Sequence, residues 1–127
     1  VLQYTAGELP SHGAVWLLYY PNIMVEWYPH TLVISSIWPT GMESCRNTVE
    51  FYYPEEIALF ERDFVEAEQA AYQETALEDD EICKMMTAGR RALFEQGINE
   101  TGPYQIPMEA GLEQFHQFLR QKMQRYV

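Results

Sequence analysis

Basic residues, cysteines and long apolar runs are all scarce in this sequence. Its 127 residues include 8 Lys and Arg against 19 Asp and Glu, so the formal net charge is −11. A surface of this charge repels phosphate backbones, which excludes nucleic acid as an expected partner. No apolar run approaches the roughly 20 residues that a transmembrane helix needs, so we expect no membrane partner either.

The cysteine content is low enough to exclude a disulfide framework. Cys45 and Cys83 are the only two cysteines, and neither belongs to a C-x-x-C pair. Reduced thiols are the rule in the cytoplasm, so we expect a cytoplasmic protein. The patterns H-x-x-x-H, H-E-x-x-H and G-x-S-x-G are absent, as is a phosphate-binding loop. No short motif therefore assigns a reaction.

The first half of the chain has the pattern of an antiparallel sheet. Apolar and β-branched residues fill four short segments, 14–20, 23–28, 31–38 and 45–53, and turn residues follow the first three. Glu26 interrupts the second segment, and the last one alternates, with Val49, Phe51 and Tyr53 on one face. Connections this short require antiparallel neighbours. We therefore predict strands over about residues 13–53.

At Pro54 the hydrophobic period changes from two to about 3.6. Pro54 and the acids after it predict a helix start, with apolar spacing to Ala71. The sequence 75–78 fits a capping box and predicts a second helix that ends at Gly97. A third helix is predicted from Pro107 to the end. Residues 54–127 are thus helical, and the fold class is α+β, with an antiparallel sheet covered by helices.

The second predicted helix contains the candidate site residue, Asp79. Its spacing places it on one face with Ile82, Cys83 and Met86. A carboxylate on a buried face requires a partner, a proton or a metal ion. The alternative is a half-exposed Asp79 in the first helical turn, where it interacts only with the helix dipole.

The acids and histidines around this candidate have simpler interpretations. Residues 55–81 hold eleven acids and one base. This run is typical of a solvated helix face, and an acidic partner-binding surface is the weaker alternative. His12, His30 and His116 show no metal-ligand spacing. We interpret the first two as loop or turn residues and His116 as packed beside Phe115.

A series of short segments, taken in order, carries a family resemblance. The segments are Tyr20–Met24, Ile37–Gly41, Glu78–Cys83, the single residues Gly89, Phe94 and Gly97, and the pair Glu109–Gly111 and Phe115–His116. Their order and spacing resemble the C-terminal portion of the catalytic domain of Rieske-type ring-hydroxylating oxygenase alpha subunits, nearest the choline and carnitine monooxygenase type. The resemblance covers the chain from about Gly13 onward. It implies a partial helix-grip fold, similar to Bet v 1 and START domains.

The resemblance also implies an activity and its cofactors. The family binds mononuclear Fe(II) through two histidines and one carboxylate, and the carboxylate corresponds to Asp79. A [2Fe-2S] Rieske cluster elsewhere in the protein supplies electrons, which come from a reductase or ferredoxin. The expected reaction is O₂-dependent hydroxylation of a small organic substrate by a monooxygenase or dioxygenase, including enzymes of aromatic compound catabolism. A homo-oligomer is expected.

The sequence departs from the family pattern in several places. Thr87 stands where the family usually has Gln, and the motifs D-x-x-H-x-x-x-x-H and C-x-H…C-x-x-H, which hold the two metal centres, are absent. Since the chain also begins without Met, we expect a C-terminal portion of one catalytic domain that is inactive alone. The alternative is a stand-alone helix-grip module that binds an apolar ligand. Trp16, Trp27 and Trp38 are candidates for a pocket lining, although ordinary sheet packing is the better explanation of them.

Overall fold

The computed structural model describes residues 13–98 and 102–126, and it confirms the α+β class. Four strands form one antiparallel sheet in the order β1-β2-β3-β4. Their bounds are β1 Val15–Tyr19, β2 Ile23–Trp27, β3 Leu32–Gly41 and β4 Ser44–Tyr52. Three helices follow: α1 Glu55–Phe60, α2 Arg62–Glu95 and α3 Ala110–Met123. All four predicted strands are confirmed.

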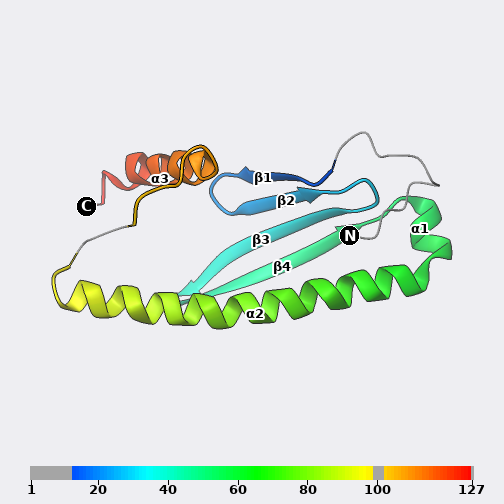
Figure 1. Ribbon diagram of the computed structural model, residues 1–127, viewed down its shortest axis with the longest axis horizontal. Coiled ribbons are helices and arrows are strands. Elements are labelled where there is room, and N and C mark those ends of the chain that lie inside the picture. Colours follow the sequence, from blue (N-terminus) through cyan, green and yellow to red (C-terminus); the bar gives the residue numbers. More distant parts are fainter. Residues whose placement is uncertain (1–12, 99–101, 127) are drawn as a thin grey trace.

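One face of the sheet, here called the inner face, lies against α2 (Figure 1). The strand registers pair Glu26 with Val33 and Val33 with Phe51, so these three side chains share this face. Val33 is 1% exposed and belongs to the core. Val49, Phe51 and Tyr53 are half-buried while their neighbours are exposed, as their alternation predicts.

The predicted first helix is interrupted at Glu61. Pro54 precedes α1, whose first turn carries Glu55 and Glu56, and Ile57 is buried at 2% exposure. The backbone of Glu61, at φ −117° and ψ 50°, leaves the helical region, and α2 starts at Arg62. Hydrophobic spacing continues across this break, which explains why the pattern did not reveal it.

The predicted second helix start at Thr75 is wrong. α2 is continuous over 34 residues, and Thr75 lies in its interior. The Thr75 hydroxyl donates a hydrogen bond of 3.1 Å to the carbonyl oxygen of Ala71, one turn earlier. A threonine inside a helix can satisfy its hydroxyl in this way, so the same residue pattern that fits a cap is also compatible with an uninterrupted helix.

The predicted end of α2 at Gly97 is confirmed. Gly97 has φ +73°. Its N–H donates to the carbonyl of Phe94, and the N–H of Ile98 donates to that of Leu93, both at 2.9 Å. This pair of bonds is a Schellman motif, which favours glycine because other residues are strained at positive φ. The last helix starts at Ala110 instead of Pro107, since residues 106–109 form turns.

α2 is longer than the part of it that the sheet covers. Its first third carries the half-buried residues, whereas every residue from 73 to 92 is exposed. Figure 1 shows this second part running past the tip of the β3–β4 hairpin, where Arg91 forms an ion pair with Glu43. α3 lies at the end of the β1–β2 hairpin, where Tyr20 contacts Phe115 and Phe118 at ring distances of 5.3 and 4.9 Å. None of the helices in the described part of the chain has the length and apolarity that a bilayer crossing requires.

Candidate functional site

The interface between α2 and the inner face is polar as well as apolar. Phe64, Glu68 and Tyr72 are half-buried and recur at intervals of four residues, which places them on one side of α2. Tyr72 meets Phe51 of β4 edge-on, with ring centroids 5.3 Å apart. Phe64 meets His30 in the same edge-on manner at 5.3 Å. Two carboxylates, Glu68 and Glu26, lie between these aromatic contacts.

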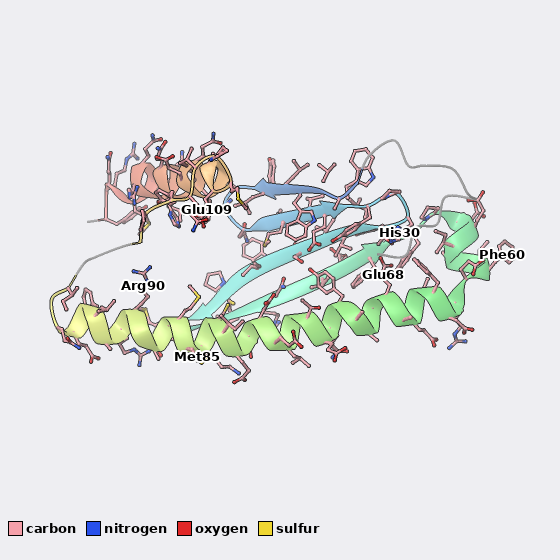
Figure 2. All side chains as sticks on the ribbon, in the orientation of Figure 1. His30, Phe60, Glu68, Met85, Arg90 and Glu109 are labelled. Carbon is pink, nitrogen blue, oxygen red and sulfur yellow. The ribbon has the colours of Figure 1, made fainter. Side chains whose placement is uncertain are left out.

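Glu68 binds the loop that precedes β3. Its carboxylate accepts hydrogen bonds from the hydroxyl of Thr31, at 2.9 and 3.1 Å, and contacts Nε2 of His30 at 3.0 Å. His30 and Thr31 are buried at 4% and 2% exposure. Figure 2 shows His30 and Glu68 pointing toward one another between the sheet and α2. Nδ1 of His30 has no hydrogen-bond partner among the described residues. His30 therefore lies in the turn between β2 and β3, as predicted, and it is buried there.

Glu26 occupies the other end of the interface. Its two carboxylate oxygens accept hydrogen bonds from Tyr28, at 2.7 Å, and from Tyr72, at 2.9 Å. The Tyr72 hydroxyl also lies 3.3 Å from the hydroxyl of Ser35, which is buried. The Tyr72 hydroxyl thus connects α2 to both β2, through Glu26, and β3, through Ser35. Within the described part of the chain no Lys, Arg or His forms an ion pair with Glu26.

The tyrosines of this interface have raised pKa values. Burial, together with the hydrogen bond to Glu26, raises the pKa of Tyr28 to about 12. Burial and the neighbouring Glu68 carboxylate raise the pKa of Tyr53 to about 12 as well. Both hydroxyls therefore stay protonated at neutral pH, and that of Tyr28 donates its hydrogen bond to Glu26.

Asp79 lies on the same side of α2 as Tyr72, but it is exposed. The two residues are seven positions apart, which is close to two helical turns. Burial raises the pKa of Tyr72, and the negative charge of Asp79 contributes to the rise. The predicted companions Ile82, Cys83 and Met86 are also exposed. The prediction that this face is buried is therefore wrong for the described residues, since every residue of α2 from 73 to 92 is exposed.

The acids next to Asp79 are solvated, as predicted. Asp80 and Glu81 both bind Lys84, at 2.7 and 3.1 Å. Because these pairs are exposed and lie one turn apart, they stabilise the helix only slightly. Among the three acids Asp79, Asp80 and Glu81, Asp79 is thus the one on the side of α2 that carries Tyr72.

The remaining histidines do not join Asp79. His12 lies outside the described residues. Nδ1 of His116 lies 2.7 Å from the hydroxyl of Tyr104, between α3 and the loop before it. No group of three His, Cys, Asp or Glu side chains with metal-binding geometry occurs in the described ranges. These residues therefore do not fit a complete mononuclear iron site, and at most they offer one carboxylate ligand.

Two grooves lie beside α3. One, of about 470 Å³, runs between α3 and the edge of the sheet and includes Trp16, Met24 and Glu26. The other, of about 540 Å³, lies between α3 and the end of α2 and includes Arg90, Tyr104 and His116. Figure 2 shows Arg90 pointing from α2 toward the side on which α3 lies.

Of the three tryptophans, Trp16 lines one of the two grooves beside α3. Trp16 pairs with Glu26 across β1 and β2, so it shares the inner face. Trp27 and Trp38 occupy the opposite face of the sheet, and both are more than half exposed.

Glu26 and Glu68 were not identified as site residues from the sequence. The signal that could have identified them was the position of each acid: Glu26 interrupts an apolar strand, and Glu68 lies within the apolar stripe of a helix.

Comparisons with known proteins agree on one family. The family described as "Ring hydroxylating alpha subunit (catalytic domain)" matches residues 4–125. Putrescine 2-hydroxylase of Ralstonia nicotianae is 61% identical over 97% of this chain and 34% of its own length. The protein of that name in Bordetella bronchiseptica is 55% identical over 97% of this chain and 29% of its own.

A more distant relative is the chloroplastic choline monooxygenase of Spinacia oleracea, 31% identical over 82% of this chain and 23% of its own length. The chain thus spans about a third of the length of the curated relatives, or less. The comparison with solved structures gave no match.

Proposed function

Because the chain belongs to the ring-hydroxylating alpha-subunit family, within its catalytic domain, we propose that it forms one wall of a hydroxylase active site and supplies the carboxylate ligand of its iron. The proposed ligand is Asp79. The observation that carries this proposal is the position of Asp79 on α2. The side of α2 that packs on the sheet up to Tyr72 continues along the helix to Asp79, where it is exposed.

The proposed reaction is O₂-dependent hydroxylation of an amine. The relatives are named for putrescine and choline, both of which carry a positively charged nitrogen. The identity to the putrescine hydroxylases is much higher, so a diamine is the proposed substrate and monooxygenation the proposed outcome. Fe(II) held by two histidines and one carboxylate has open positions at which O₂ can react.

The remaining parts of such an enzyme belong to the same proposal. The two histidine ligands and the Rieske [2Fe-2S] cluster are supplied by residues other than those described, and electrons arrive from a reductase or ferredoxin. We also propose that the protein is a homo-oligomer and that it is cytoplasmic. The apolar side of α2 beyond Tyr72, which the described residues leave uncovered, supports a contact with further protein there.

A substitution of Asp79 tests the ligand role. In the product of the whole reading frame that encodes this chain, we expect Asp79→Ala to lose mononuclear iron and putrescine-dependent O₂ uptake. Asp80→Ala is the matched control, because Asp80 is an adjacent acid paired with Lys84, and it should keep both. Iron content is measured after removal of loosely bound metal. Full iron occupancy in Asp79→Ala would contradict the proposal.

A second candidate function is a non-catalytic module that binds an apolar ligand. The groove of about 470 Å³ beside α3, with its aromatic and aliphatic lining, favours this alternative. Under it, Asp79→Ala leaves ligand binding unchanged and improves stability slightly, since an unpaired acid is removed. The iron measurement therefore separates the two functions.

A further inference from the structure

The groove between α3 and the sheet edge contains a single charged side chain. Its wall is aromatic and aliphatic, with Trp16, Met24 and Ile37 from the sheet and Phe115 from α3. Glu26 is the only ionisable residue among its lining. An apolar groove with one carboxylate matches an alkyl chain that carries one or more positive charges.

Glu26 has hydrogen-bonding capacity left for a ligand. An ionised carboxylate has about four acceptor positions. Tyr28 and Tyr72 occupy one position on each oxygen, and both tyrosines are neutral donors. A half-buried carboxylate that receives only neutral hydrogen bonds is less stable than one that also has a cation beside it. The two tyrosines hold the carboxylate in place while leaving room for a charged donor.

Trp16 lies next to this carboxylate. It is the direct cross-strand partner of Glu26 in the β1–β2 register, so both side chains project from the same face. Trp16 is 71% exposed, although it borders the groove. An exposed indole beside a carboxylate is a favourable combination for an alkylammonium group, because a cation gains from both the ring and the negative charge.

We propose that Glu26 binds a primary ammonium group of the substrate, with Trp16 beside it and the alkyl chain along Met24 and Ile37. The inference rests on the proposed amine hydroxylation. It commits to a primary ammonium over a quaternary one, because only the former has N–H donors for the free acceptor positions of Glu26.

The placement also orients the chain of the substrate. Tyr72 donates to Glu26 and lies on the same side of α2 as Asp79. Seven residues of helix separate Tyr72 and Asp79 by about 10 Å along the axis. A short diamine fixed at Glu26 is shorter than this separation, so its far end points toward Asp79 without reaching it.

The test uses the product of the whole reading frame and measures O₂ uptake with putrescine. We expect Glu26→Gln to raise the KM at least tenfold while kcat changes less than threefold. The amide can still bond to both tyrosine hydroxyls, accepting from one through its oxygen and donating to the other through its nitrogen, but it loses the charge. Glu66→Gln is the control. It removes one carboxylate from an exposed position of α2, where Glu66 pairs with Arg62 and does not border the groove, so its KM should stay within twofold.

A measurement on the unaltered protein covers the case in which Glu26→Gln does not fold. n-Butylammonium should inhibit putrescine turnover at a concentration at least tenfold below that of 1-butanol, which has the same chain length and no charge. Equal inhibition by the two, or an unchanged KM in Glu26→Gln, would overturn the role of Glu26 while leaving the hydroxylase function intact. Absence of O₂ uptake with putrescine and with choline would instead refute the proposed function itself.

Discussion

Removal of the Glu68 carboxylate is the strongest test of how α2 is held on the sheet. Glu68 accepts hydrogen bonds from Thr31 and contacts His30, and both of these residues are almost completely buried. In Glu68→Ala, the Thr31 hydroxyl and Nε2 of His30 both lose their partner. We therefore expect the chain to unfold at much lower urea concentration.

The magnitude follows from the two groups left unpaired. Each buried polar group without a partner costs about 1–3 kcal/mol. The Glu68 side chain is 19% exposed, so water partly compensates, and we expect a total loss of about 2–4 kcal/mol. With a typical dependence of unfolding free energy on urea of about 1–3 kcal/mol per M, the unfolding midpoint falls by roughly 1–2 M.

The assay is urea unfolding of the chain, followed by far-ultraviolet circular dichroism and tryptophan fluorescence. Glu66→Ala is the matched control, because Glu66 forms only an exposed ion pair with Arg62 at 2.7 Å, one turn apart on the same helix. That change should cost about 0.3–0.5 kcal/mol. If Glu68→Ala were no less stable than Glu66→Ala, the result would show that the contacts of Glu68 with His30 and Thr31 do not hold α2 on the sheet.

Three further predictions concern other parts of the chain. Thr75→Ala should stabilise α2 by roughly 0.5 kcal/mol, because alanine is the better interior helix residue, whereas a loss of about 1 kcal/mol in urea unfolding would indicate a helix cap there. Since the folded pKa values of Tyr28 and Tyr53 are about 12 and tyrosine ordinarily titrates near 10, their contribution to stability is complete below pH 10 and is lost as pH rises toward 12. Absorbance at 295 nm should show late-titrating tyrosines, and Tyr28→Phe should remove one of them. The isolated chain should self-associate through the exposed side of α2, and Ile82→Glu should lower its mass in sedimentation; an unchanged mass distribution would exclude this surface.

The strands were predictable because each has a local signal. Short apolar runs end at turn residues, and the alternation of Val49, Phe51 and Tyr53 gave the correct buried face. The helix boundaries were less predictable. A break at Glu61 leaves the hydrophobic period intact, and Thr75 has the same local sequence whether it caps a helix or bonds backward within one.

The candidate site depends on contacts far apart in the sequence, and this limits prediction. Glu26 meets Tyr72 across 46 positions, and Glu68 meets Thr31 across 37. Spacing on one helix could place Asp79 relative to Ile82, but it could not show that this part of α2 stays exposed although the β3–β4 hairpin runs beside it. The family resemblance supplied the role of Asp79, which periodicity alone could not.

The unbroken course of α2 makes the position of its far half depend on its near half. Residues up to Tyr72 anchor the helix to the sheet, and the 23 residues after it extend for about 35 Å. A rigid rod fixed near one end magnifies any tilt at the anchor in proportion to distance. A small repacking around Phe64 or Glu68 would then move Asp79 slightly and Arg91 about twice as far. Substitutions near the anchor can therefore retune the geometry of a remote site without touching it.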